Sequence, residues 1–191
     1  MEFCIEMFNL APVKGYEDDV GTKTNFTTVN QSILSKGEDP LVGKESIAAF
    51  DALQRQFQGS LLWVPAFSQR GYYEFVQRIV NVSLASGIMK PVVQNPGHFI
   101  GMMRLWRALH RRSDWPSTGL YIVSAAFELC EEIDVFGFWF YETSLEGVPA
   151  PYHYHNDIIF GTRHSRFKEF QDLVNFHEMG ILKMHFGSCK S

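Results

Sequence analysis

The segment Pro116-Ser-Thr-Gly119 combines residue types that suit a bound anion. It opens an apolar helical pattern, so two hydroxyls and free backbone N–H groups should lie at the positive end of a helix dipole. Phosphate groups bind in this geometry. An ordinary helix N-cap is the simpler explanation of Ser and Thr before a helix, so the segment alone leaves both roles open.

Histidines supply the other candidate chemistry. His153 and His155 stand two residues apart in a predicted loop, where they could bind a metal, pair with phosphate or face solvent. No H-E-x-x-H or D-x-D spacing supplies further ligands, so we expect no catalytic metal. His177 lies near the end of a predicted helix, where a helix-end cap is the commoner role and a general base the alternative.

Short apolar runs alternate with helical periodicities along the chain. We expect strands over residues 24–29, 60–67 with an end at Pro65, 91–94, 133–138 and 181–186. We expect helices over residues 45–57, 73–85, 97–112, 118–131 and 167–179, and a loop over 142–166. This alternation favours an α/β fold with a mainly parallel sheet and helices on both faces.

The composition is that of a globular protein. Of the 191 residues, 46% are hydrophobic and 20% charged, which predicts one compact domain. The formal net charge of -4 creates no general field that attracts nucleic acid, so we expect no nucleic-acid partner. No apolar run approaches the ~20 residues that span a bilayer. Sequons at Asn25, Asn30 and Asn81 permit N-glycosylation in the secretory pathway.

Four ordered segments together resemble the sialyltransferases, and within them the α2,8-sialyltransferases. Asn9-Leu-Ala-Pro12 with residues 19–24 resembles the end of the long sialylmotif, and residues 24–34 continue it. Residues 116–139 resemble the short sialylmotif over its length.

The last two motifs lie nearer the C-terminus. Residues 151–154, Pro-Tyr-His-Tyr, are similar to the third sialylmotif. His177 with Gly180 and Cys189 is similar to the very short terminal motif. The order and spacing of all four segments agree with the family, and the resemblance covers nearly the whole chain.

The resemblance implies a modified Rossmann-like fold of the GT-A type, with residues 1–191 forming the C-terminal part of a single catalytic domain. It implies inverting transfer of sialic acid from CMP-sialic acid in α2,8 linkage, with neither a metal nor another cofactor. The acceptor is expected to be a sialylated glycoprotein or glycolipid. The full-length form is expected to carry a membrane anchor and to act on the luminal side of the Golgi membrane.

The motifs also carry over expected site residues. The CMP part of the donor is expected to contact Asn9, Ser117, Thr118, Gly119, Trp139, Tyr152 and His153. The Ser-Thr-Gly helix start and His153 would hold the phosphate, while His177 would take the proton of the attacking hydroxyl as general base. A single displacement of this kind needs no enzyme nucleophile.

The chain also departs from the family pattern. It begins after the Val-Gly-Asn-Ser/Gly stretch and the cysteine that open the long motif, so the usual disulfide partners of Cys130 and Cys189 are expected to be missing. A Cys4–Cys189 pair is the alternative. Two other interpretations therefore stay open: a catalytically inactive relative or fragment that retains nucleotide or glycan binding, and an unrelated interaction module with a nucleotide-like fold.

Overall fold

The computed structural model describes residues 6–7, 9–30, 41–67, 71–110, 116–151, 153–155 and 166–187. The chain divides into two compact units, an N-terminal unit, Glu2–Gly101, and a C-terminal unit, Met102–Ser191. The boundary falls within helix α5 (Pro96–His110). The expected single catalytic domain over residues 1–191 stays a prediction.

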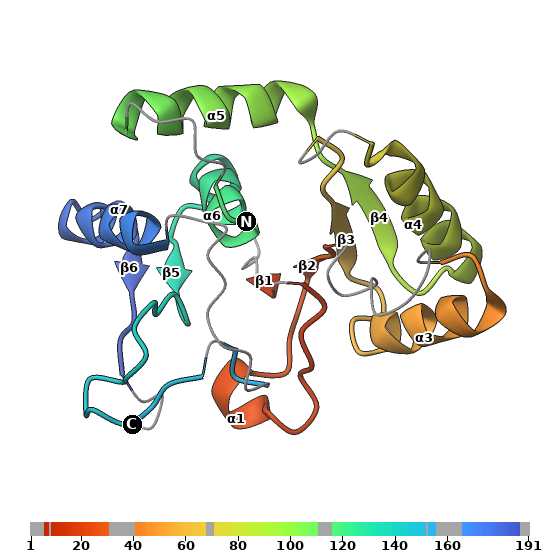
Figure 1. Cartoon of the computed structure of the whole chain (residues 1–191), viewed down its shortest axis with the longest axis horizontal. Helices are drawn as coiled ribbons and strands as arrows, with labels where there is room; N and C mark the ends of the chain where they lie inside the picture. The colour runs from red at the N-terminus through yellow and green to blue at the C-terminus, as the bar shows by residue number, and fades with distance from the viewer. Residues whose placement is uncertain are drawn as a thin grey trace. The chain divides into compact units, whose positions relative to one another are not determined.

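The N-terminal unit contains a four-stranded parallel sheet. Its strands follow the order of the chain: β1 (Glu6–Met7), β2 (Phe26–Thr28), β3 (Leu61–Val64) and β4 (Lys90–Val93). Helix α3 (Lys44–Arg55) precedes β3, α4 (Tyr73–Ser86) connects β3 to β4, and the short α1 (Glu17–Val20) precedes β2. Right-handed crossovers between neighbouring strands in this order place α3 and α4 on one face of the sheet. Figure 1 shows them packed next to each other beside β4.

The core of this unit lies between the sheet and these helices. Leu62 and Val64 on β3, Ile79 on α4, and Phe50 on α3 are all fully buried. The run Leu62-Trp-Val64 is buried without alternation, as is common for strands of parallel sheets. The apolar pattern that predicted this strand is therefore explained by the burial of its residues.

The C-terminal unit is built around a two-stranded parallel sheet. Its elements are α6 (Thr118–Leu129), β5 (Asp134–Val135), α7 (Arg166–Glu178) and β6 (Lys183–Met184), with α7 on the crossover from β5 to β6. The end of α5 packs here as well, because Trp106 donates a hydrogen bond from Nε1 to Ser124 Oγ on α6 at 3.1 Å. Its ring also meets the edge of Phe176 on α7, with centroids 6.0 Å apart.

The α/β class with parallel strands is confirmed, while several boundaries differ from the expected ones. The fourth predicted strand is only two residues long, because Gly137 adopts a left-handed φ of 73°. Helix α6 ends at Leu129 because Cys130 is already extended. Gly180, at φ 72°, follows α7 closely as predicted. Strand β1 and helix α1 were not predicted, since each is too short to show a periodicity.

Among the described helices, none has the length and apolar character needed to cross a bilayer. The sequon asparagines Asn25 and Asn81 are exposed, whereas Asn30 is half-buried. Cys4 and Cys189 lie outside the described residues, so the expected disulfide pattern stays a prediction.

Candidate functional site

The start of α6 has the N-cap geometry that the sequence favoured. Ser117 is extended, with φ −64° and ψ 161°, and its Oγ accepts a hydrogen bond from the Leu120 N–H at 3.1 Å. The Ser117 carbonyl accepts the first helical bond, from the Tyr121 N–H. The N–H group of Gly119 belongs to the first turn, where the helix itself supplies no acceptor. This end of α6 therefore carries a first-turn backbone donor and two hydroxyl side chains.

A buried carboxylate already lies at this helix start. Glu169, in the first turn of α7, is only 6% exposed, and its Oε1 accepts a hydrogen bond from the Ser117 N–H at 2.8 Å. Its Oε2 is buried and has no hydrogen-bond partner within the described part of the chain. A negative group at a helix N-terminus is favourable for the dipole. Sequence reasoning missed Glu169, because no local pattern connects it to a residue 52 positions away.

Gly119 has a packing role at the same helix start. A Cβ at this position would lie 2.8 Å from Cζ and 3.0 Å from Cε1 of Phe138, closer than real side-chain atoms approach. The missing side chain therefore allows the Phe138 ring to lie against the first turn of α6. The expected contact between Gly119 and CMP stays a prediction.

Trp139 belongs to an aromatic cluster that also reaches the first turn of α7. Its Nε1 donates a hydrogen bond to the Thr143 carbonyl at 2.8 Å. Its ring meets Tyr141, Phe170 and Phe186, with centroids 4.9, 5.9 and 6.1 Å away. Phe170 directly follows Glu169, so neighbouring α7 side chains contact Trp139 and Ser117. The structure therefore brings the Ser-Thr-Gly helix start and Trp139 together around one helical turn.

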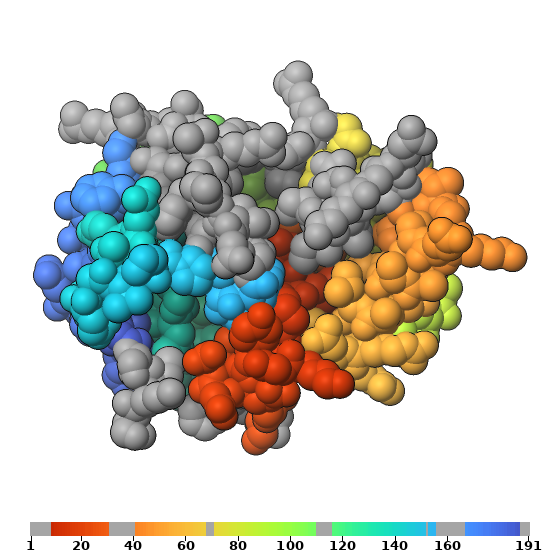
Figure 2. All heavy atoms as spheres, turned by 60° about the horizontal axis from the view of Figure 1, so that its bottom comes forward, coloured from red at the N-terminus to blue at the C-terminus, as the bar shows by residue number. Residues whose placement is uncertain are grey.

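The loop after this cluster lies on the surface. Tyr141, Leu145 and Val148 are all exposed, and a bridge between Thr143 and Pro149 closes the loop. Figure 2 shows this stretch, in turquoise, on the face turned to the viewer. The aromatic cluster is therefore bordered by an exposed apolar loop.

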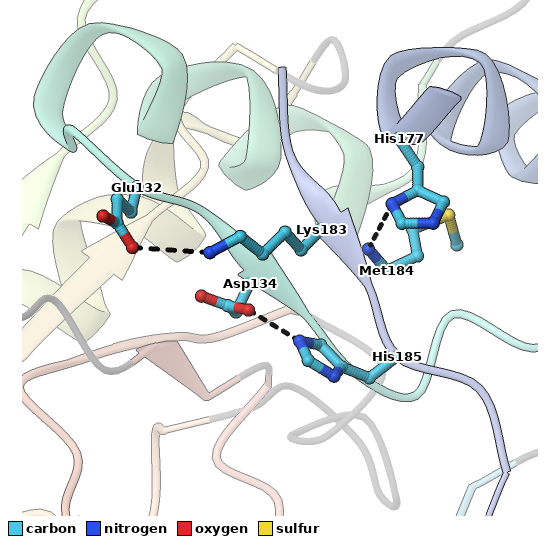
Figure 3. A network of polar contacts seen from close by, with 6 residues as sticks. All are labelled: Glu132, Asp134, His177, Lys183, Met184 and His185. Carbon is cyan, nitrogen blue, oxygen red and sulfur yellow. Dashed lines mark hydrogen bonds and ion pairs between the residues drawn. The ribbon is translucent and has the colours of Figure 1, made fainter. Parts of the chain in front are cut away.

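His177 lies at the other end of α7. Its Nδ1 accepts a hydrogen bond from the Met184 N–H at 3.3 Å, a contact drawn in Figure 3. A neutral imidazole with this bond carries its proton on Nε2, so the lone pair that a base would use is engaged. His177 follows Glu169 by eight residues, which corresponds to about 12 Å along a helix. The structure therefore does not place His177 beside Ser117.

A second histidine on the two-stranded sheet has a carboxylate partner. His185 Nε2 and Asp134 Oδ1 are 2.6 Å apart, and the ring of Phe136 stacks on the imidazole at 4.2 Å. Figure 3 shows this pair beside the ion pair of Lys183 and Glu132. The parallel register of β5 and β6 brings the residues of both pairs close together, and no local spacing in the sequence connects His185 with Asp134.

His153 and His155 stack on each other. Their centroids are 5.3 Å apart and their planes differ by 2°. Burial lowers the pKa of His155, and the neighbouring His153 lowers this pKa further.

Tyr152 lies outside the described residues. Asn9 belongs to the N-terminal unit, where it forms hydrogen bonds with Thr28 and Asn30. No group of three or more His, Cys, Asp or Glu residues in the described ranges is arranged to hold a metal.

We predict that Gly119→Ala destabilises the protein by about 1 to 3 kcal/mol, because the added methyl forces the Phe138 ring to move. Chemical denaturation of wild type and variant measures the difference. Gly101→Ala is the matched control: it adds the same group in helix α5 with nothing within 4 Å, so it should stabilise slightly. Equal stability of Gly119→Ala and wild type would contradict the packing role.

We predict that His155 makes the protein less stable in mild acid. Its pKa is lowered in the folded state, so the unfolded chain binds the proton more readily and stability falls as pH drops below about 6.5. His155→Gln should therefore reduce the loss of unfolding free energy between pH 7.5 and 5. Denaturant titrations at both pH values measure this loss, and equal losses in variant and wild type would refute the assignment.

Known proteins match almost the whole chain. The model of glycosyltransferase family 29 (sialyltransferase) matches residues 3–181. The alpha-N-acetylneuraminide alpha-2,8-sialyltransferase of Xenopus laevis is 33% identical over 186 residues, which cover 95% of this chain and 51% of that protein. The alpha-2,8-sialyltransferase 8F of Mus musculus is 32% identical over 187 residues, which cover 96% of this chain and 46% of that protein. The chain thus spans about half the length of these curated relatives.

The fold agrees with this relationship. A crystal structure of a mammalian sialyltransferase superimposes with a TM-score of 0.60 and 16% sequence identity, over 98% of this chain and 61% of that one. The predicted resemblance is confirmed by a family model that extends from the first motif to beyond His177. This chain belongs to glycosyltransferase family 29, the sialyltransferases.

Proposed function

We propose that the protein transfers sialic acid from CMP-sialic acid to a sialylated glycoprotein or glycolipid in α2,8 linkage, with inversion and without a metal. The observation that carries the proposal is the joint site formed by the Ser117 helix start and Trp139 around the first turn of α7. The names of the relatives support the α2,8 linkage. The exposed sequons at Asn25 and Asn81 suit a location on the luminal side of the Golgi membrane.

The start of α6 would bind the CMP part of the donor. Its hydroxyls and first-turn N–H groups are neutral donors that suit phosphate or ribose oxygens. Glu169 constrains this choice, because its carboxylate already bonds to the Ser117 N–H. A phosphate close to this carboxylate would be repelled by its negative charge. A phosphate at this helix start must therefore gain more from its hydrogen bonds than it loses by this repulsion.

We predict that Ser117→Ala combined with Thr118→Ala weakens CMP binding at least tenfold, because two hydroxyl donors are lost. Isothermal titration calorimetry with CMP and with cytidine measures the loss and separates the phosphate from the nucleoside. Glu169→Gln retains the acceptor for the Ser117 N–H and removes the charge. It should strengthen CMP binding and leave cytidine binding unchanged when the phosphate lies at this helix start. Full-strength CMP binding by the double variant would contradict the assignment.

His177 is the proposed general base. For this role its Nδ1 must exchange the hydrogen bond from Met184 for the proton of the attacking hydroxyl. We predict that His177→Ala lowers the rate of transfer by a factor of about 10² to 10⁴ and leaves CMP binding intact, because proton transfer and donor binding use different groups. Transfer assays with CMP-sialic acid and a sialylated acceptor measure the rate, and calorimetry measures the binding.

Two other histidine variants make this experiment specific. His185→Ala removes a nearby exposed imidazole that pairs with Asp134 and serves as the matched control. His164→Ala tests a histidine that precedes α7 and lies outside the described residues. Unchanged transfer by His177→Ala would refute its role as the base.

A catalytically inactive relative that retains nucleotide or glycan binding is the second candidate function. The engaged lone pair of His177 and the carboxylate at the α6 start both favour it, because each opposes a step of transfer. CMP binding without transfer by the wild-type protein would support this alternative. Measurable transfer would exclude it.

A further inference from the structure

The turn after β1 contains an unusual pair of backbone conformations. Asn9 and Leu10 both lie in the left-handed region, with φ 61° and 48°. Asparagine tolerates this region because its side chain bonds locally, but leucine does not, and two such residues in succession are uncommon. Conformations of this kind persist only where the surrounding structure fixes them, and they concentrate at ligand sites.

Side chains of β2 fix this turn. The Asn9 N–H donates to Thr28 Oγ1 at 2.8 Å, and the Leu10 N–H donates to Thr27 Oγ1 at 3.3 Å. Both threonines are completely buried, and the Leu10 side chain is 1% exposed. Two adjacent hydroxyls and one buried apolar side chain therefore hold the strained backbone in place. A buried N–H left without either acceptor would be costly, so the turn cannot relax freely.

The Asn9 side chain is oriented by a third bond. Its Oδ1 accepts from the Asn30 N–H at 2.8 Å. A backbone N–H is always a donor, so the atom that faces it must be the amide oxygen, and this fixes the orientation of the amide. The two N–H donors of Nδ2 then point elsewhere, and the structure records no hydrogen bond from them to a described residue. Asn9 is half-buried and thus presents a fixed hydrogen-bond donor.

We propose that Thr28, assisted by Thr27, is a positioning residue for donor binding: its hydroxyl holds Asn9 so that Nδ2 donates to an oxygen acceptor of the bound nucleotide. This inference rests on the proposed function, because the ligand is the CMP part of the donor. Preorganisation is the physical benefit, since an amide that is already oriented loses little freedom on binding. The strain at Leu10 is the structural cost of that orientation.

The experiment compares CMP affinity across a double-mutant cycle in the complete chain. Thr28→Val keeps the shape of the side chain and removes the acceptor for the Asn9 N–H, so CMP should bind about tenfold more weakly. Thr28→Ser restores the hydroxyl and should restore the affinity. In an Asn9→Ala background, Thr28→Val should have no further effect on CMP binding, because Thr28 acts only through Asn9. A purely structural role of Thr28 would instead lower affinity equally in both backgrounds.

Ser60→Ala is the matched control for lost stability. Ser60 is buried in the same unit, and its hydroxyl bonds to the Thr24 carbonyl, away from Asn9. This variant should lose stability without losing CMP affinity. If the wild-type chain binds CMP and Thr28→Val binds it with the same affinity, the role of Thr28 is overturned and the proposed function stands. Failure of the wild-type chain to bind CMP would overturn the proposed function, and the role of Thr28 with it.

Discussion

The candidate site of the C-terminal unit depends on the contacts made by the first turn of α7. Glu169 accepts the hydrogen bond of the Ser117 N–H, and the next residue, Phe170, packs against Trp139. Two neighbouring side chains thereby fix a helix start and an aromatic segment at the same place. The N–H group of a helix start and a buried carboxylate are each costly when unpaired, so their hydrogen bond satisfies both.

The same contact restricts the chemistry of the site. A carboxylate at a helix N-terminus uses part of the positive potential that would otherwise attract a phosphate. The rigid helix also separates its two ends by fixed distances, so His177 lies about 12 Å along the axis from Glu169. Its ring is engaged with the Met184 N–H, at the edge of the two-stranded sheet. Phosphate recognition and proton transfer in this unit would therefore depend on opposite ends of α7.

The N-terminal unit fixes a polar side chain by different means. Its turn after β1 has no helix to order it, and buried threonine hydroxyls of β2 take the place of a backbone ladder. The conformation at Leu10 is unfavourable by itself and is maintained by burial of the side chain and by the Thr27 bond. Rigidity here comes from neighbouring structure that over-determines the backbone, which is the usual condition for strain to persist.

Most of the fold could be predicted from the sequence, because helical periodicity, apolar strands and turn glycines are local properties. The Ser117 cap, the end of α7 near Gly180, and the buried strand β3 all agree with their patterns. The family could be recognised because its motifs are likewise read in order along the chain. Strand β1 escaped prediction because its two residues are too few for a period, whereas β5 was predicted with bounds that are too long.

The tertiary structure alone decided which of the expected site residues meet. The sequence determined the types and spacing of Ser117, Trp139 and His177, but their partners are set by packing across long intervals of the chain. Glu169 reaches Ser117 over 52 positions, and the Met184 N–H occupies the ring nitrogen expected to act as a base. Hydrogen bonds of this range depend on where whole elements pack, and no local pattern in the sequence encodes that placement.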